Sequence, residues 1–386
     1  MVPHCGPGEA DGGVIYLDYQ ATTPVAPEVA SAMQPWIEER FANPHSPSRW
    51  GHEAAAAIEF ARKQIEKALG FKGGGIAFTG SATEAINWAL KGTVEKERGN
   101  GRSRVITLAT EHAAVLDSCE WLAEQGVDLT VLPVQSNGRL DLDLLARELD
   151  ERVLLVSVMM VNNEIGVTQS ISEIADMAHR NGAIVFCDAV QAFGRLDLST
   201  GPDLVAISAH KIHGPKGIGA LWMKKGKEPA ALIHGGGQEQ GLRSGTLSPE
   251  LCVGFGAAAN LANERATRDL DHVQRLWTAA LDSLGPRWIV NGCTQCRYHG
   301  NLNIRREGLD AARLVADLRD IAFSLGSACA SGSGRPSHVL RALGLDYREA
   351  RSSIRLGFGR YTKHNELVEA CERIAAAAVE QEKLDA

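Results

Sequence analysis

Short apolar runs alternate with longer amphipathic segments along the first half of the chain. Runs that are rich in Val, Ile and Leu and bounded by turn residues predict buried strands, and the segments between them predict helices. We therefore expect an α/β fold in which a mostly parallel sheet, with right-handed crossovers, is flanked by helices. The predicted strands are residues 75–79, 104–109, 129–133, 153–160, 183–187, 204–208 and 219–223.

This rhythm changes after a glycine-rich segment at residues 235–241, which precedes an alanine-rich helix predicted for residues 253–268. We interpret that helix as a connector to a second domain with shorter, mixed elements. The later elements expected are strands at residues 301–304 and 352–358 and a closing helix at residues 366–383. We predict a large domain of residues 15–255 and a small α+β domain of residues 256–386. Part of the N-terminal segment is expected to belong to the small domain.

Composition narrows the possible classes of protein. The chain has 386 residues, of which 44% are hydrophobic, and a formal net charge of −7, which suits an enzyme with a large core and two domains. No apolar run approaches the roughly 20 residues of a membrane span, and no signal peptide is recognisable. We therefore expect a cytoplasmic protein without a membrane or direct nucleic-acid partner. Eight scattered cysteines in so long a chain are expected to be reduced thiols.

Polar side chains follow two of the predicted strands and suggest a cofactor site. Lys211 lies just beyond the strand at residues 204–208, where a partly desolvated amine could form a Schiff base with an aldehyde cofactor. Asp188 follows the strand at residues 183–187 and could keep a pyridine nitrogen protonated, while Gln191 could reach the ring hydroxyl. Singly, the lysine could be a surface residue and the aspartate a helix cap. Together they favour pyridoxal 5′-phosphate (PLP).

The phosphate of such a cofactor requires free N–H groups at the start of a helix. A strand is expected to end at residue 79 and a helix to begin near Ala82, with Thr83 offering both a hydroxyl and an amide. Ser81 and Glu84 also have the spacing of a capping box, which is compatible with phosphate binding. Two further candidate phosphate ligands precede Lys211, namely Ser208 and His210.

Two more polar residues follow predicted strands at the carboxyl edge, where ligands of α/β proteins bind. His112 comes after the strand at residues 104–109 and could cover one face of the cofactor ring, although a structural histidine is the alternative. Asn163 follows the strand at residues 153–160, so its amide should point toward the same rim. Paired asparagines could equally form a turn.

A candidate nucleophile lies in the predicted small domain. Cys329 stands among small residues from Ser327 to Gly334, with no bulky apolar neighbour, which favours a reactive thiol in a loop over a buried core cysteine. Arg355 lies in the strand expected at residues 352–358, where its planar fork could bind a carboxylate. An amino-acid substrate would fit both residues.

Together these segments resemble the NifS/IscS-type cysteine desulfurases, which belong to the class V aminotransferases among the fold type I PLP enzymes. The opening residues 1–13 match nothing that we recognise in that family. The resemblance otherwise covers nearly the whole chain, in residues 16–24, 43–46, 83–84, 111–112, 162–166, 188–191, 208–217, 243–246, 327–329 and 353–356.

The resemblance implies a homodimer whose sites lie near the interface between subunits. Four residues would hold the cofactor ring: Lys211 as the anchor, His112 stacked on it, Asp188 at its nitrogen and Gln191 at its hydroxyl. The phosphate would be bound by Ala82, Thr83, Ser208 and His210, and by Thr246 of the partner subunit. Asn163 and Arg355 would hold the substrate carboxylate.

The implied reaction converts L-cysteine to L-alanine, and the sulfur passes to Cys329 as a persulfide for delivery to an acceptor protein. Lys211 would act as a proton shuttle, and His112 is a candidate for deprotonating the substrate thiol. Iron–sulfur cluster biosynthesis, tRNA thiolation and cofactor synthesis stay open as destinations. Family members that dock an iron–sulfur scaffold use a further C-terminal extension, so that partner is an open question here.

Two other classes of protein stay possible from the sequence. Another class V PLP enzyme, such as a selenocysteine lyase, an epimerase or an aminotransferase, would share the fold and would not require Cys329. A non-catalytic sulfur-relay or metal-binding scaffold would rest on the scattered thiols and would form no adduct at Lys211.

The pair Cys293 and Cys296 has the C-x-x-C spacing of some metal and redox sites. No second close pair of cysteines exists, Cys5 is isolated, and His299 would bring the cluster to three ligands at most. We therefore expect no metal site.

Overall fold

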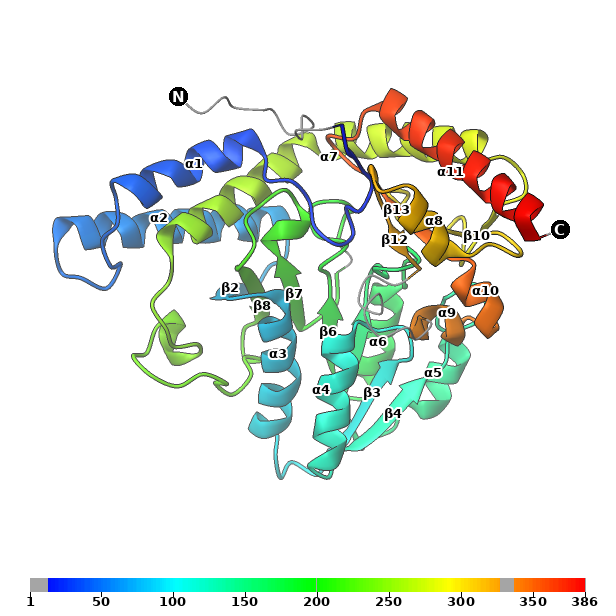
Figure 1. Ribbon diagram of the computed structural model, residues 1–386. Helices are drawn as coiled ribbons and strands as arrows, with labels where there is room; N and C mark the ends of the chain where they lie inside the picture. Colours follow the sequence, from blue (N-terminus) through cyan, green and yellow to red (C-terminus); the bar gives the residue numbers. More distant parts are fainter. Residues whose placement is uncertain (1–12, 199, 327–336, 386) are drawn as a thin grey trace.

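A seven-stranded sheet forms the centre of the computed structural model, which describes residues 13–198, 200–326 and 337–385 (Figure 1). The order across the sheet is β2-β8-β7-β6-β5-β3-β4, and among these strands β8 alone runs against its neighbours. Each predicted strand is confirmed to within one residue at either end. The strands are β2 (Gly74–Thr79), β3 (Arg104–Leu108), β4 (Asp128–Leu132), β5 (Val153–Met159), β6 (Ile184–Asp188), β7 (Leu204–Ser208) and β8 (Gly219–Lys224).

Helices cover both faces of this sheet because alternate strand residues point to opposite sides and both sides are apolar. In β7, Leu204 and Ala206 belong to one buried cluster, whereas Val205 and Ile207 belong to the other. The first cluster includes residues of α3 (Ala82–Lys96) and α4 (Ala113–Glu124). The second includes residues of α2 (Arg49–Leu69), α5 (Leu142–Glu148), α6 (Ile171–Arg180) and α7 (Pro249–Leu284).

Helix α7 is longer than predicted. The sequence led us to end it at residue 268, but it continues for 36 residues to Leu284. The charged stretch at residues 264–271 interrupts the apolar period, and the buried face resumes at Val273 and Trp277. Helix α1 (Pro27–Glu38) and α2 pack against the first part of α7, and α11 (His364–Asp385) packs along the rest (Figure 1).

The C-terminal part contains an antiparallel sheet in the order β12-β13-β10-β9. The two strands and the closing helix expected there are confirmed. Its elements are β9 (Ile289–Val290), β10 (Asn301–Arg305), α8 (Ala311–Asp317), β12 (Ser324–Leu325), α9 (His338–Ala342), α10 (Tyr347–Arg351) and β13 (Ser353–Gly357). The domain division at residues 255 and 256 stays a prediction, since α7 is continuous across it.

The beginning of the described chain connects the two sheets. Strand β1 (Ile15–Tyr16) pairs with β11 (Ile321–Ala322), and Asp18 forms a bridge with Gly357 at the end of β13. The N–H of Thr23 then donates to the carbonyl of His210 at 3.0 Å, beside the large sheet. Residues 18–23 therefore lie between β13 and the turn that follows β7. Within the described residues, no helix has the length and apolar character needed to cross a membrane.

Candidate functional site

A cavity of about 570 Å³ lies at the carboxyl edge of the parallel strands, where the large sheet meets the C-terminal part. Of the predicted site residues, Cys329 lies outside the described residues, and Thr246 is exposed and does not line this cavity. All the others do. The lining includes Ala82, Thr83, His112, Asn163, Asp188, Gln191, Ser208, His210, Lys211 and Arg355.

Lys211 ends a single 3-10 turn, Ala209–Lys211, that directly follows β7. Its Nζ donates hydrogen bonds to the backbone carbonyls of Gln20, at 2.5 Å, and Ala21, at 2.7 Å. These partners come from the N-terminal segment, to which the sequence pattern assigned no role beyond the resemblance at residues 16–24. The amine is thus held at the cavity wall by two carbonyl oxygens. Both of these acceptors are neutral backbone carbonyls.

Asp188 is the last residue of β6 and is buried, with one oxygen accepting the Val190 N–H at 2.9 Å. Burial raises the pKa of its carboxyl, although that N–H and the neighbouring His112 and Lys211 act in the opposite direction. A protonated ring nitrogen beside it would supply a close opposite charge and favour the carboxylate. The donor set of the cavity therefore fits the pyridinium of PLP.

Glu111 lies behind the cavity wall and was not singled out by the sequence pattern. It is fully buried, and one carboxyl oxygen accepts the Met159 N–H at 2.9 Å while the other has no partner among the described residues. Burial raises the pKa of Glu111 well above its usual range, and the nearby charge of Asp188 acts in the same direction. A neutral Glu111 avoids a second buried negative charge next to Asp188.

His112 is the N-cap of α4, and its Nδ1 accepts the Ala114 N–H at 3.1 Å. That bond requires a lone pair on Nδ1, so the proton of the neutral imidazole lies on Nε2. The cap also fixes the direction of the ring, which lines the cavity. Stacking on a cofactor and capping a helix are therefore compatible roles for His112.

The start of α3 contributes the anion-binding end of the cavity. Ser81 is the N-cap, and its side chain accepts the Glu84 N–H at 3.2 Å. The capping box is only half formed, because the Glu84 carboxylate accepts the Gly80 N–H at 2.7 Å instead of that of Ser81. Gly219 allows this close packing, since a Cβ there would lie 2.8 Å from the nitrogen of Ala82.

Neutral polar side chains complete this end of the cavity. Ser208 is the buried last residue of β7. The Nδ1 of His210 lies 3.1 Å from the Thr22 hydroxyl, and burial together with the charges of Lys211 and Lys216 lowers the pKa of His210 to about 4. His210 is therefore neutral at pH 7 and can donate a hydrogen bond without adding a charge.

Gln191 lines the cavity, and both ends of its amide already have partners. Its Nε2 donates to the carbonyl of Gln20 at 3.1 Å, and its Oε1 accepts from Arg195. One N–H of Nε2 is left by this count for a ring hydroxyl. The contact to Gln20 also holds the carbonyl that accepts from Lys211.

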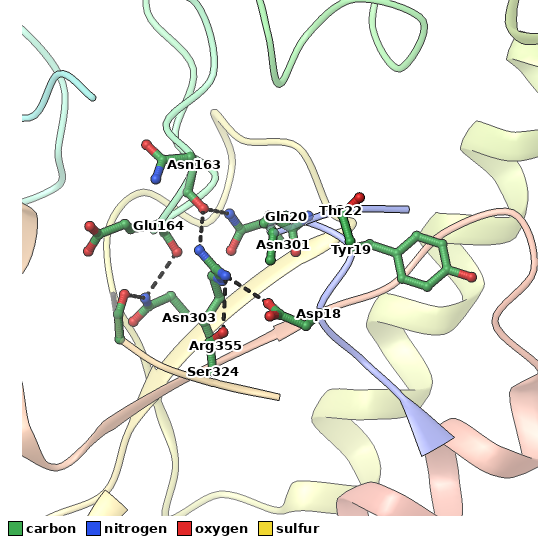
Figure 2. Close-up of polar contacts among 12 residues, drawn as sticks. Asp18, Tyr19, Gln20, Thr22, Asn163, Glu164, Asn301, Asn303, Ser324 and Arg355 are labelled. Atoms are coloured by element: carbon green, nitrogen blue, oxygen red, sulfur yellow. Dashed lines mark hydrogen bonds and ion pairs between the residues drawn. The ribbon is translucent and has the colours of Figure 1, made fainter. Parts of the chain in front are cut away.

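Arg355 occupies the opposite wall, in β13, and only 1% of it is exposed. Its Nη1 donates to the Asn163 carbonyl at 3.0 Å, and its Nη2 donates to Asp18 at 2.7 Å and Ser324 at 3.3 Å. Figure 2 shows the guanidinium between these groups, while the side-chain amide of Asn163 points away from it. Within the described chain, the Nε of Arg355 has no partner. Asp18, which the sequence pattern did not single out, thus forms the ion pair that balances the charge of Arg355.

Comparisons with known proteins agree with this geometry. The family model described as "Aminotransferase class-V" matches residues 15–369. A relative from Rickettsia bellii named "Cysteine desulfurase IscS" is 43% identical over 371 residues, which cover 94% of this chain and 90% of the relative. A solved structure titled "NIFS-LIKE PROTEIN" has a TM-score of 0.87 and 32% identity, and the match covers 95% of this chain and 100% of that one.

A further solved structure is titled "SspA in complex with cysteine". It has a TM-score of 0.81 and 33% identity, and the match covers 90% of this chain and 100% of that one. The matches of sequence and of fold thus agree with each other over almost the full length of the chain. The chain therefore belongs to the class V aminotransferase family, among its cysteine desulfurases.

Proposed function

We propose that this protein is a PLP-dependent cysteine desulfurase in which Lys211 anchors the cofactor and Cys329 receives the sulfur of L-cysteine. The observation that carries the proposal is the single cavity in which a lysine amine, a buried aspartate and the start of α3 meet. Each of these matches one part of PLP: the aldehyde, the ring nitrogen and the phosphate. The relative named as a cysteine desulfurase and the structure titled as a cysteine complex support the same reaction.

The cofactor supplies an electron sink for the bonds at the substrate Cα. The chain would hold it through Lys211 Nζ, with His112 over the ring, Asp188 at the nitrogen and Gln191 at the hydroxyl. The phosphate would take the N–H groups of Ala82 and Thr83 together with the side chains of Thr83, Ser208 and His210. The neutral state of His210 favours this arrangement, since it donates to the phosphate without needing a counter-charge.

The substrate would be oriented from the opposite wall. Arg355 would bind the cysteine carboxylate, together with the side-chain amide of Asn163. Lys211, once free of the cofactor, would carry the proton to and from Cα. The Nε2 of His112 carries the proton in the neutral ring, so Nδ1 is the nitrogen that could accept a proton from the substrate thiol, and it would have to give up its bond with the Ala114 N–H to do so.

The sulfur would leave on Cys329, whose thiolate attacks the substrate sulfur and leaves L-alanine after proton transfer. Cys329 itself lies outside the described residues, but the chain on either side is held near the cavity. On one side the Gly326 N–H donates to the Ser353 carbonyl at 3.1 Å. On the other, Ser337 donates to Glu164, and the ring of His338 lies 2.9 Å from the carbonyl of Glu111.

We also propose a homodimer that completes each site with Thr246 of the partner subunit. Four large apolar residues in α1, in α2 and in the segment between them are each at least 60% exposed, namely Ile37, Phe41, Trp50 and Phe60. A second cavity, of about 580 Å³, runs from α2 to the loop before Thr246. A second copy covering this side would bury the apolar residues and receive the exposed Thr246.

The loop before Thr246 is firmly held, which favours this role. The Glu239 carboxylate accepts two hydrogen bonds from Arg62, at 2.9 and 2.7 Å, and the Phe78 N–H at 2.7 Å. Arg243 forms a second ion pair with Glu84 at the start of α3, at 2.7 Å. The loop can therefore present Thr246 in one position without help from the partner.

The reaction is tested by measuring L-alanine released from L-cysteine by the PLP-loaded protein with a thiol reductant. We expect Cys329→Ala to keep the cofactor colour and to release no alanine, whereas Cys293→Ala, which removes a partly exposed thiol outside the cavity, should release it normally. If the protein is yellow and inactive on L-cysteine but turns over selenocysteine even without Cys329, the result would instead support another class V enzyme. A colourless wild-type protein after PLP loading would support the scaffold.

The shared site is tested by forming mixed dimers of Lys211→Ala and Thr246→Ala subunits. If Thr246 serves the partner's cofactor, one site of each mixed dimer is intact, so random mixing should restore about a quarter of the wild-type activity. If Thr246 serves its own subunit, mixing restores nothing. The sulfur acceptor and the cytoplasmic address stay predictions from the sequence.

A further inference from the structure

Two thiols lie close together in the loop that joins β9 to β10, outside the cavity described above. Cys293 and Cys296 are partly exposed. The other cysteines among the described residues are buried, namely Cys119, Cys187, Cys252 and Cys371. The proposed reaction makes no use of the exposed pair.

The backbone sets the two thiols at a spacing that a disulfide can bridge. The Cys296 N–H donates to the sulfur of Cys293 at 3.2 Å. The Cα of Cys296 is one bond of about 1.46 Å from that nitrogen, so the sulfur lies within about 4.7 Å of it. The N–H of Cys293 donates to the Asn137 carbonyl at 2.7 Å, and the Thr168 N–H donates to the Cys296 carbonyl at 3.0 Å. Both ends of the pair are therefore fixed.

The guanidinium of Arg139 lies beside the two thiols. The Nη1 of Arg139 lies 3.0 Å from the sulfur of Cys296, and its Nη2 is held by the Ser170 hydroxyl. A guanidinium at this distance favours a thiolate and disfavours a divalent cation. No group of three His, Cys, Asp or Glu side chains in the described part of the chain is arranged to hold a metal ion.

The thiol of Cys293 differs in acidity from the buried ones. Burial acts to raise its pKa, but hydrogen bonds from the backbone of Cys296 and Gln295, the Cys296 side chain and the charge of Arg139 outweigh it, and the pKa falls below the usual value. By contrast, burial raises the pKa of Cys119 and of Cys371 to about 12. Of these three thiols, Cys293 therefore has the largest fraction of thiolate at any given pH.

We infer that Cys293 and Cys296 form a redox-active dithiol that exchanges with low-molecular-weight disulfides of the glutathione type. The Cys293 thiolate attacks one sulfur of the disulfide, whose S–S bond breaks and releases one thiolate. Cys296 then loses its proton to solvent and attacks the Cys293 sulfur, which releases the second thiolate. The protein dithiol is oxidised by two electrons and the small disulfide is reduced to two thiols. This site is independent of the proposed desulfurase reaction.

The test is a redox titration of the whole PLP-loaded protein in the Cys329→Ala background, which keeps that thiol from forming mixed disulfides. Samples at set ratios of oxidised to reduced glutathione are alkylated, digested and weighed. Over one two-electron transition, we expect the peptide with both cysteines to become two hydrogen atoms lighter than the dithiol peptide and to carry no alkyl group, and reductant should reverse the change. Cys296→Ser should stop at a glutathione adduct on Cys293, and Cys293→Ser should form no intramolecular disulfide.

A second pair of variants tests the role of Arg139. Arg139→Gln should slow the first exchange step at pH 7 about threefold for each unit by which the pKa of the Cys293 thiol rises, because lost thiolate outweighs gained nucleophilicity. Arg139→Lys, which keeps the charge, should restore most of the rate. The proposal would be overturned if both thiols were still fully alkylated at a ratio of oxidised to reduced glutathione that oxidises a small dithiol used as a control. Stoichiometric zinc in the purified protein would also overturn it.

Discussion

Replacing Arg355 with lysine tests the proposed substrate contact, because the change keeps the positive charge and removes the planar fork. In the wild-type chain the guanidinium already donates to Asp18, Ser324 and the carbonyl of Asn163. A lysine ammonium has three N–H donors. Once it has paired with Asp18 and the Asn163 carbonyl, it has at most one donor left for a substrate carboxylate.

The expected loss follows from that difference in donors. One missing hydrogen bond to a charged group costs about 1.5–3 kcal/mol. This corresponds to a fall in kcat/KM of about 10- to 150-fold. Because the carboxylate does not change during the reaction, the contact holds substrate and transition state alike. The loss should therefore appear mainly as a higher KM for L-cysteine, with kcat nearly unchanged.

The assay is alanine release at varied L-cysteine, with the bound cofactor followed by its absorbance. Arg360→Lys is the matched control. Arg360 is also buried, with a side chain 5% exposed, and pairs with Asp269 at 2.7 Å, the distance between Arg355 and Asp18. It does not line the cofactor cavity. Both variants should lower the melting temperature, and only Arg355→Lys should change KM.

Two results would refute the reasoning. The first is a kcat/KM of Arg355→Lys within about twofold of wild type in a protein that keeps its cofactor. The second is an equal rise in KM for both variants, which would mean that the effect comes from general loosening of the fold. A loss confined to kcat would point to a role in the reacting step instead of carboxylate binding.

Three other outcomes are expected from contacts described above or nearby. Glu239→Gln should lower the free energy of unfolding in urea by up to about 3 kcal/mol, because Arg62 loses its buried charged partner and keeps only the largely exposed Glu59; an unchanged value would contradict this. Burial and the charge of Arg360 lower the pKa of His213 to about 3. An unfolded histidine titrates near pH 6.5, so between about pH 6.5 and 3 the unfolded state takes up a proton that the folded state does not. The free energy of unfolding therefore decreases as the pH is lowered through this range. His213→Asn, which tolerates the positive φ of 67°, should make unfolding free energies at pH 7 and 4.5 more alike than in wild type. Gly357→Ala should lower the melting temperature and weaken PLP retention, since the new Cβ would lie 1.8 Å from the Gln20 side chain. Normal PLP retention would mean that the packing of Gln20 against Gly357 does not affect the cofactor site.

Local pattern was enough to predict the strands of the large sheet, because each is a short apolar run and the central ones, β5, β6 and β7, are buried on both faces. It also predicted the positions after strand ends that line the cavity, since parallel strands bring their carboxyl ends to one edge. The predicted end of α7 was wrong because residues 264–271 are mostly charged and show no apolar face. The helix is held there by the buried residues further along, such as Val273 and Trp277.

Contacts between distant segments were beyond the sequence pattern. Asp18 and Arg355 are 337 positions apart, and each looks ordinary in its own segment. The carbonyls of Gln20 and Ala21 that accept from Lys211 carry no side-chain signal at all. Glu111 was overlooked because a single carboxyl beside a histidine reads as a surface residue, and only its burial gives it a role next to Asp188.

The passage of residues 18–23 between the two sheets has a consequence for biosynthesis. These residues emerge early from the ribosome, yet Asp18 pairs with Arg355 and Gly357, which emerge almost last. Closing so long a loop costs entropy that nascent chains cannot recover until both ends exist. Until translation is nearly finished, the segment whose carbonyls hold Lys211 is therefore anchored on one side only, through contacts such as Thr23 with His210, and a chain released before β13 should bind PLP poorly however well its large sheet has folded.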